Sequence, residues 1–365
     1  MLTPDLDDIS SWQYDLPAEL IASRPAVRRD DSRLMIVRRD SERIEHGQIR
    51  DLPDLLSAGD LLIFNNTKVL PARLFGFRTS TEGKWEGLFL EQLCDKHWKI
   101  AGQTRGKLTA GESITLIPAV EMGQTPSPRP SQSSDALQLK LVERSADGTW
   151  LASPSLQGDS IQLLEQYGTL PLPPYIGRKV ADADDQLRYQ TVFANEPGAI
   201  AAPTAGLHFT PELLQRCADN GIASSEVTLH VGIGTFRPVS SQRLSEHRMH
   251  AEWGRLPQES ANSIASVRAS GGNVVAVGTT SVRTVEAAAL SGTLAGWQGS
   301  TDLFIKPGFE FKVADQLLTN FHLPGSTLIV LVAAMAGYKL TMEAYRQAVS
   351  EKYRFYSYGD AMLIL

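Results

Sequence analysis

The sequence predicts an α/β main domain with an inserted small antiparallel β-barrel domain. Short alternating segments separated by Gly-bearing turns run from about residue 72 to 150, which is typical of a small barrel or sandwich. After residue 170 the pattern changes to strand, Gly or polar turn, and helix, which is typical of a layered α/β domain. We therefore expect a discontinuous α/β catalytic domain, residues 1–69 plus 155–365, and an inserted β-barrel domain, residues 70–154.

The N-terminal stretch contains one predicted helix and two predicted strands. A helix is expected over residues 16–21, because Pro17 in a first turn loses no hydrogen bond. Apolar runs predict strands over 33–37 and 60–64. The second strand leads into a polar cluster, 65–68, which we expect to form a loop at the strand end.

The insert contains five predicted strands, and the remainder of the chain supplies the helices and the buried strands. In the insert, the strands are expected over 73–77, 85–93, 97–101, 113–117 and 137–142. The polar, Pro- and Ser-rich stretch 123–135 predicts a flexible loop.

In the C-terminal half, Thr210 is expected to cap a helix that Gly221 closes. Further strands are expected over 226–231, 273–277 and 303–305, and helices over 282–290 and 326–336. The aromatic residues between Tyr353 and Asp360 favour a terminal strand with its rings in the core, although such a composition also suits stacking on bases.

Charge and hydropathy exclude some classes of protein. The net charge is −6 and there is no basic tail, which disfavours nonspecific coating of nucleic acid. Eight arginines between positions 24 and 50 face only five acids, so either a local basic patch or an ordinary solvated surface is possible there. The longest apolar run, 328–336, is far shorter than the roughly 20 residues that span a bilayer. With no targeting segment apparent, we expect a cytoplasmic protein without membrane contact.

Five of the seven histidines lie between positions 208 and 322, in motifs rich in Gly, Thr and Pro. Histidine is suited to proton transfer near neutral pH, so this clustering indicates acid–base chemistry. The alternative for each one is a half-buried structural residue. These five histidines are His208, His230, His247, His250 and His322.

Two motifs have specific alternatives. His247, His250 and Glu252 are residue types that bind metals, but their spacing is not a strong metal signature. A base with an orienting carboxylate is the favoured interpretation of these residues. No metal is therefore expected. The segment VGTTSVRT from Val277 places a Gly and hydroxyls between a strand and a helix, where an anionic group binds well, or where ordinary N-capping occurs. The loops around Thr204 and residues 232–238 are similar small-residue loops.

Ten motifs in order resemble the S-adenosylmethionine:tRNA ribosyltransferase-isomerases, a family of queuosine-biosynthesis enzymes. The resemblance runs from about Tyr14 to the C-terminus. The motifs are YDLPAELIA from Tyr14, RDDSRL from Arg29, FNNTKVLPARL from Phe64, LPPYI from Leu172, RYQTVFA from Arg188, AAPTAGLHF from Ala201, TLHVG from Thr228, VGTTSVRT from Val277, TNFHLP from Thr319 and YRFYSYGDAM from Tyr353.

The resemblance implies an enzyme that uses S-adenosylmethionine as a ribosyl donor rather than a methyl donor. It implies transfer and isomerisation of the ribosyl moiety onto 7-aminomethyl-7-deazaguanine at the tRNA wobble position. The products would be epoxyqueuosine-tRNA, adenine and methionine. It also implies an α/β domain with an inserted barrel, and we expect a monomer. Rival classes are a metal-dependent hydrolase and a noncatalytic RNA-binding module.

The chemistry suggests roles for the site residues. A proton on the 5′ carbon beside a sulfonium is acidified, so a neutral imidazole suits the base, and departing adenine needs an acid. Arg283 and Asp360 suit the carboxylate and ammonium of the methionine part. The catalytic candidates are His230, His250, Glu252, His208 and His322. The substrate-binding candidates are Arg283, Thr279, Thr280, Ser281, Thr204, Gly206, Arg237, Asn320, Asp360, Tyr175, Asn65 and Lys68.

Overall fold

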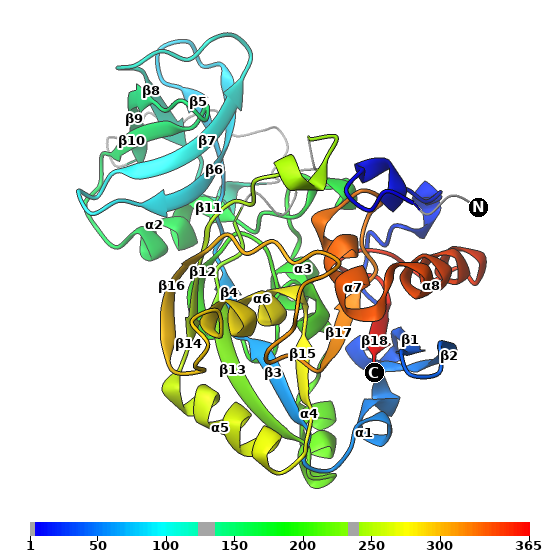
Figure 1. Ribbon diagram of the computed structural model, residues 1–365. Helices are drawn as coiled ribbons and strands as arrows, with labels where there is room; N and C mark the ends of the chain where they lie inside the picture. The colour runs from blue at the N-terminus through cyan, green and yellow to red at the C-terminus, as the bar shows by residue number, and fades with distance from the viewer. Residues whose placement is uncertain (1–3, 123–135, 233–240) are drawn as a thin grey trace. The chain divides into compact units, whose positions relative to one another are not determined.

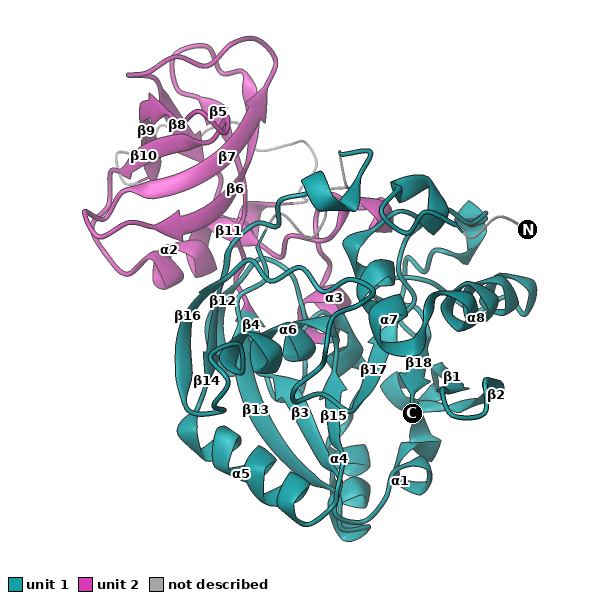
Figure 2. Cartoon of the chain, in the orientation of Figure 1, with its two compact units in different colours: residues 1–68, 188–365 teal, residues 69–187 magenta. Residues whose placement is uncertain are grey.

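The computed structural model describes residues 4–122, 136–232 and 241–365. It divides into two compact units, Met1–Lys68 with Arg188–Leu365, and Val69–Leu187 (Figure 2). The first unit is an α/β structure and the second contains an antiparallel barrel, so the predicted fold class is confirmed. The second unit continues past residue 154, the end expected for the insert. The predicted loop at 123–135 lies outside the described residues.

The first unit is built on a nine-stranded sheet in the order β16-β14-β13-β3-β15-β17-β18-β1-β2 (Figure 1). Four adjacent strands, β13, β3, β15 and β17, run parallel to one another. Strand β18 is antiparallel to β17 and parallel to β1, while β14, β16 and β2 add antiparallel edges. The strands are β1 Arg33–Arg38, β2 Arg43–Gln48, β3 Leu61–Asn65, β13 Ala223–Leu229, β14 Glu252–Leu256, β15 Val274–Val277, β16 Trp297–Thr301, β17 Gln316–Asn320 and β18 Ala361–Ile364; a short pair joins β4 Thr67–Val69 to β12 Glu196–Ala199.

Helices cover both faces of this sheet, because successive side chains of its buried strands point to opposite sides. In β3, Leu61 and Ile63 pack in one apolar cluster, whereas Leu62 and Phe64 pack in the other. The first cluster includes residues of α5, α6, α7 and α8, and the second includes residues of α1 and α4. The helices are α1 Leu52–Leu55, α4 Pro211–Asp219, α5 Gln258–Ala269, α6 Thr279–Ala288, α7 Thr327–Ala336 and α8 Tyr338–Ser350.

Local sequence signals explain where two helices begin. The Thr210 hydroxyl accepts a hydrogen bond from Leu213 N at 3.1 Å and caps α4, as predicted. Ser326 caps α7 in the same way, and α7 is buried along most of its length. Residues 16–21, by contrast, contain only a 3₁₀ turn, Ala18–Leu20.

The predicted strand 303–305 is wrong, and the neighbouring residues form edge strand β16 instead. The Leu303 carbonyl accepts a hydrogen bond from the Arg283 side chain at 3.2 Å, so a side chain takes the place of a strand partner there. The aromatic segment before β18 is also a turn rather than a strand, but Tyr353 and Phe355 are fully buried, as the core interpretation predicts.

In the second unit, six antiparallel strands close into a barrel. The order β5-β6-β7-β10-β9-β8 is completed by pairing between β5 and β8. The Trp85 indole lies against Gly87 and Gly102, which face each other on β6 and β7, and any side chain at either glycine would overlap the indole. The elements are β5 Arg73–Arg78, β6 Lys84–Gln92, β7 Trp98–Thr104, β8 Ser113–Leu116, β9 Gln138–Arg144, β10 Trp150–Pro154, β11 Gly168–Thr169, α2 Ser160–Tyr167 and α3 Ala183–Arg188.

Within the described residues, no single helix has the length and apolar character needed to cross a membrane. The helices α7 and α8 satisfy these criteria only when taken together, and the chain bends by 119° between them. Most residues of α7 belong to the first apolar cluster of the sheet.

The strand pairing predicts that a fragment ending at Leu187 cannot form the large sheet. Strand β3 pairs with β13 and β15, and β1 pairs with β18, all of which lie after residue 187. We expect the amides of residues 61–65 to exchange freely in a 1–187 fragment and to be protected in the full chain. Hydrogen exchange with mass analysis measures this, and strong protection of β3 in the fragment would contradict the discontinuous arrangement.

Candidate functional site

Four predicted site residues lie at one edge of the sheet, where the four parallel strands end. Asn65 ends β3, His230 follows β13, Thr279 follows β15 after one glycine, and Asn320 ends β17. The pairing registers Asn65 with Val227 and places the ends of neighbouring strands level. Ligands of open α/β sheets bind at the carboxyl ends of the strands, so this edge is the candidate active site.

The imidazole of His230 is half-buried at this edge and is held from several sides. Its Nδ1 lies 2.8 Å from the Thr67 hydroxyl, and its ring stacks on Trp253 with centroids 5.1 Å apart and planes 19° from parallel. Gly198 lies so close that a Cβ atom there would be 2.6 Å from Nε2. Burial lowers the pKa of His230, and the charge of Glu196 partly opposes this. A neutral imidazole at neutral pH is the form that accepts a proton.

The side chain of Asn65 fixes the backbone next to His230. Its Nδ2 donates to the Leu229 carbonyl at 3.0 Å, and its Oδ1 accepts from Leu229 N at 3.0 Å and from Thr67 N at 3.2 Å. Asn65 is fully buried, so its amide serves the fold rather than projecting toward a ligand as the sequence predicts.

Glu252 and Arg283 form a buried ion pair. A carboxylate oxygen of Glu252 contacts the Arg283 guanidinium, and the other accepts from Gly232 N at 2.9 Å. Arg283 lies in the first turns of α6 and also donates to the Leu303 carbonyl at 3.2 Å. The carboxylate that the sequence predicts to orient His250 is therefore engaged by Arg283, and the guanidinium predicted to anchor the substrate is already paired.

His250 and His247 lie in the loop before β14. His250 is exposed, while Glu252, two residues later, is buried, so the expected pairing of a base with an orienting carboxylate is absent here. The His247 ring packs edge-on against Phe304 with centroids 5.5 Å apart. Burial and the neighbouring His250 lower the pKa of His247.

The first turn of α6 follows β15 through Gly278, whose φ of 91° favours glycine. No side chain caps this helix. The Ser281 hydroxyl donates back to the Val277 carbonyl at 2.8 Å, and Thr279 is buried. In the described part of the chain the buried Thr280 hydroxyl has no hydrogen-bond partner. Thr280 is therefore a hydroxyl of this motif whose hydrogen-bonding capacity is unused among the described residues.

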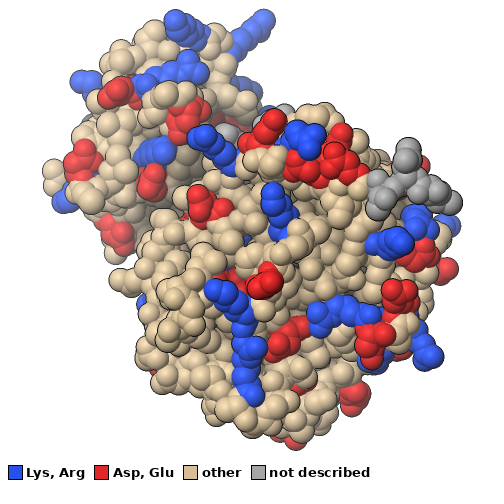
Figure 3. Space-filling view, in the orientation of Figure 1, with Lys and Arg blue, Asp and Glu red and all other residues tan. Residues whose placement is uncertain are grey.

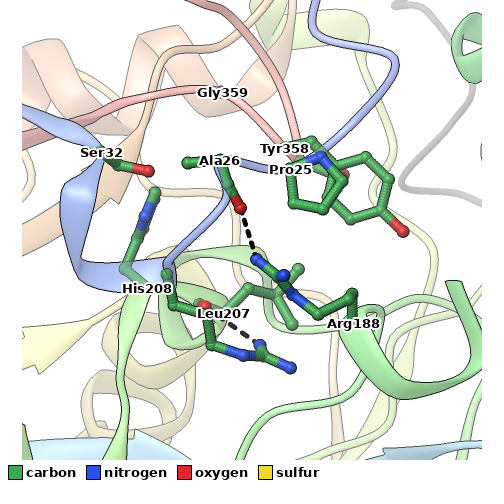
Figure 4. A pocket seen from close by; sticks show the side chains of 10 residues that line it. Pro25, Ala26, Ser32, Arg188, Leu207, His208, Tyr358 and Gly359 are labelled. Carbon is green, nitrogen blue, oxygen red and sulfur yellow. Dashed lines mark hydrogen bonds between the residues drawn. The ribbon is translucent and has the colours of Figure 1, made fainter. Parts of the chain in front are cut away.

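His208 lines a small pocket near the same edge (Figure 4). Its Nε2 lies 3.2 Å from Asn320 Nδ2, and burial lowers its pKa to about 4. Across the pocket, Arg188 donates to the Ala26 carbonyl at 2.6 Å. The pocket volume is about 20 Å³, enough for roughly one water molecule. A nucleoside does not fit there without rearrangement.

His322 and Asp360 are engaged inside the fold. Nε2 of His322 lies 2.9 Å from the Thr319 hydroxyl, and burial lowers the pKa of His322 to about 3. Asp360 is buried and accepts hydrogen bonds from Arg33 N at 3.1 Å and Arg354 N at 2.8 Å. The Asp360 carboxylate, which the sequence predicts to bind an ammonium group, thus stabilises the C-terminal turn instead.

The other predicted binding residues are dispersed. Thr204 and Gly206 lie in the 3₁₀ turn that also carries His208, and a Cβ at Gly206 would come within 2.7 Å of Phe193. Lys68 is the exposed residue of β4. Tyr175 belongs to the second unit and is half-buried. Arg237 lies outside the described residues.

Sequence reasoning missed Thr67, Gly198 and Trp253, which lie against the His230 ring. Thr67 lies within the motif FNNTKVLPARL, and this position in a family motif is the sequence feature that could have indicated a role for Thr67. Across the part of the chain that the structure describes, no three His, Cys, Asp or Glu residues lie close enough together to hold a metal ion. The metal-ligand interpretation of His247, His250 and Glu252 therefore lacks its geometry.

Basic and acidic side chains are intermingled on the face that Figure 3 draws. Figure 3 shows no broad basic area on the face it draws. Within the arginine-rich stretch, Arg28 pairs with Asp30 at 3.2 Å and Arg38 with Glu45 at 3.0 Å. Because these arginines are paired with acids, they favour the ordinary solvated surface over a basic patch in this stretch.

The two buried histidines predict loss of stability in acid. Their folded pKa values, about 4 for His208 and about 3 for His322, lie below the ordinary 6.5. Their contribution is complete above pH 6.5 and is lost as pH falls, because only the unfolded chain takes up protons. Each lowers the free energy of unfolding by at most about 1.4 kcal/mol per pH unit. Urea unfolding at pH 7, 6 and 5 measures the fall, and ring protonation of either residue in the folded protein above pH 5 would contradict it.

The sequence matches the queuosine biosynthesis protein family over residues 9–364. A relative from Symbiobacterium thermophilum, named S-adenosylmethionine:tRNA ribosyltransferase-isomerase, is 47% identical over 98% of this chain and 99% of its own. A relative of the same name from Azoarcus sp. is 46% identical over 98% and 97%.

A solved structure shows the same similarity. The crystal structure of S-adenosylmethionine tRNA ribosyltransferase from Thermotoga maritima is 36% identical and has a TM-score of 0.54. The match covers 98% of this chain and 100% of that chain. Sequence and structure agree over nearly the whole length, and the chain belongs to the queuosine biosynthesis protein family.

Proposed function

We propose that this chain is an S-adenosylmethionine-dependent tRNA ribosyltransferase-isomerase. It transfers and isomerises the ribosyl moiety of S-adenosylmethionine onto 7-aminomethyl-7-deazaguanine at the tRNA wobble position. The products are epoxyqueuosine-tRNA, adenine and methionine. The observation that carries this proposal is the 43–47% identity, over 98% of the chain, to relatives named for this activity.

His230 is the general base in this proposal. It emerges at the carboxyl edge of the parallel strands, its ring is half-buried, and burial lowers its pKa so that the neutral form dominates at neutral pH. The proton that it removes comes from the 5′ carbon beside the sulfonium, where the positive charge acidifies the C–H bond. His208 and His322 are buried and engaged, which favours structural roles for them.

The first turn of α6 receives the carboxylate of the methionine part. The Thr280 hydroxyl and the positive end of the helix dipole support this role, because α6 has no capping side chain. Arg283 lies in the same helix, and its ion pair with Glu252 holds the guanidinium in place. Thr279 and Ser281 shape the same turn.

The remaining parts of the proposal concern partners and location. We propose a monomer that acts on tRNA in the cytoplasm without a metal ion. The intermingled charges in Figure 3 favour recognition of a specific tRNA site over broad electrostatic coating on that face. A metal-dependent hydrolase would instead contain stoichiometric zinc, and a noncatalytic RNA-binding module would bind tRNA without releasing adenine.

The first prediction concerns the reaction itself. Incubation of the purified protein with S-adenosylmethionine and tRNA carrying the deazaguanine, without added metal, should yield epoxyqueuosine together with adenine and methionine. Mass analysis of the nucleosides measures the product. Methylated tRNA with S-adenosylhomocysteine as the coproduct would overturn the proposed activity.

The second prediction separates the roles of the site residues. His230→Ala should slow single-turnover adenine release by about 100- to 10,000-fold, because a general base usually contributes that much. Arg283→Ala should lower the thermal unfolding temperature, because it leaves the Glu252 carboxylate buried without its partner.

Exposed His250 supplies the comparison for His230. His250→Ala should slow adenine release much less than His230→Ala. Native unfolding temperatures in both variants ensure that the rates report on chemistry. A near-normal rate for His230→Ala at saturating S-adenosylmethionine would remove this base assignment and leave the family assignment intact.

A further inference from the structure

We propose that Thr67 and Gly198 are positioning residues that hold the His230 imidazole with its proton on Nδ1 and its lone pair on Nε2. The inference rests on the proposed function, in which His230 is the base, and adds which nitrogen acts. Thr67 and Gly198 belong to β4 and β12, which pair with each other beside the carboxyl edge of the large sheet.

The hydrogen bond between Thr67 and His230 determines which ring nitrogen is left for the substrate. Its hydroxyl has one proton, and it lies 3.5 Å from the Glu196 carbonyl and 2.8 Å from His230 Nδ1. The 2.8 Å contact suits a hydrogen bond in either direction, whereas the 3.5 Å contact to the carbonyl is at the outer limit for one. Because the Thr67 hydroxyl occupies Nδ1, Nε2 is the nitrogen left to accept a substrate proton. In that role Nε2 carries no proton, so Nδ1 donates to the hydroxyl oxygen and the Thr67 proton is directed to the Glu196 carbonyl.

Gly198 sets the position of the ring. A Cβ atom at this residue would lie 2.6 Å from Cε1, 2.6 Å from Nε2 and 2.7 Å from Cδ2 of His230. Because these three distances are nearly equal, that Cβ would stand over the face of the ring. Any side chain at position 198 would therefore displace the imidazole, whereas glycine lets the backbone lie directly against it. Trp253 stacks on the same ring, with planes 19° from parallel.

The Asn65 amide holds the backbone next to His230 in register with the backbone of Thr67. It bonds both backbone groups of Leu229, the residue before His230, and also Thr67 N. One buried side chain therefore bonds the backbone of Thr67 and of the residue that precedes His230. This arrangement limits the movement of the imidazole relative to the hydroxyl.

The proton balance is simple. The C–H bond of the 5′ carbon breaks, its electron pair stays on carbon, and its proton forms the new bond to Nε2. Nδ1 keeps its proton and its hydrogen bond to Thr67, which stabilises the imidazolium. A third group that orients the base in this way is a recurring feature of nucleophile and base arrangements.

The test uses the full chain with ¹⁵N-labelled histidine. In the wild type, the NMR shifts of His230 should show a protonated Nδ1 and an unprotonated Nε2. Thr67→Val should lose this signature and slow single-turnover adenine release by about 10- to 100-fold, with little change in the KM for S-adenosylmethionine. Thr67→Ser, which keeps the hydroxyl, should restore both.

A matched control is Thr228→Val. Thr228 is also a buried threonine, but its hydroxyl bonds Asn66 Oδ1 at 2.8 Å rather than an imidazole. This variant should lose stability without changing the His230 shifts. Gly198→Ala provides a second variant, which should lower kcat by displacing the ring even if Thr67→Val fails to fold.

The outcomes separate the two proposals. If His230→Ala reacts normally, the base assignment fails, whereas the ¹⁵N shifts still report the tautomer. If His230→Ala is slow but Thr67→Val keeps the wild-type rate and shifts, the positioning inference is overturned. A wild-type signature with Nε2 protonated overturns it as well.

Discussion

The candidate site depends on one buried amide, that of Asn65 at the end of β3. Both of its polar atoms pair with the backbone of Leu229, so the side chain continues the hydrogen bonding between β3 and β13 past the strand end. The same Oδ1 also accepts from Thr67 N. Because buried amide groups are costly to leave unpaired, replacing Asn65 with an apolar residue would release Leu229 and Thr67 together. The direction in which His230 leaves the sheet follows from this pairing.

The parallel block makes this arrangement possible. Strand β3 comes from the N-terminal segment, yet both of its neighbours, β13 and β15, come from the chain after the barrel unit. Parallel strands place their carboxyl ends at one edge, so polar loops far apart in sequence become neighbours. At the opposite ends of the strands, Asp60 accepts from Asn273 N at 2.9 Å, which holds β3 and β15 level. The barrel unit is inserted in sequence between β3 and β13, and these two strands still pair directly.

Much of the fold, but less of the site, could be predicted from the sequence. Alternation revealed the barrel strands, the Thr210 cap marked one helix and an apolar run marked another, because these signals are local. The ion pair between Glu252 and Arg283 spans 31 positions and has no local signal. Nor does any local pattern reveal that Gly198 lies against the His230 ring. Contacts of this kind are set by strand order, which the sequence alone does not display.

Burial explains why the histidines between positions 208 and 322 differ in their suitability as a general base. His208 and His322 are buried among partners, and their pKa values fall to about 4 and about 3. They are neutral, but their rings are enclosed. His250 is exposed and has no such enclosure. His230 lies between these extremes: burial lowers its pKa, while the ring stays half-buried beside Trp253. A base needs both neutrality and access to its substrate, and at the carboxyl edge of the parallel strands His230 combines them.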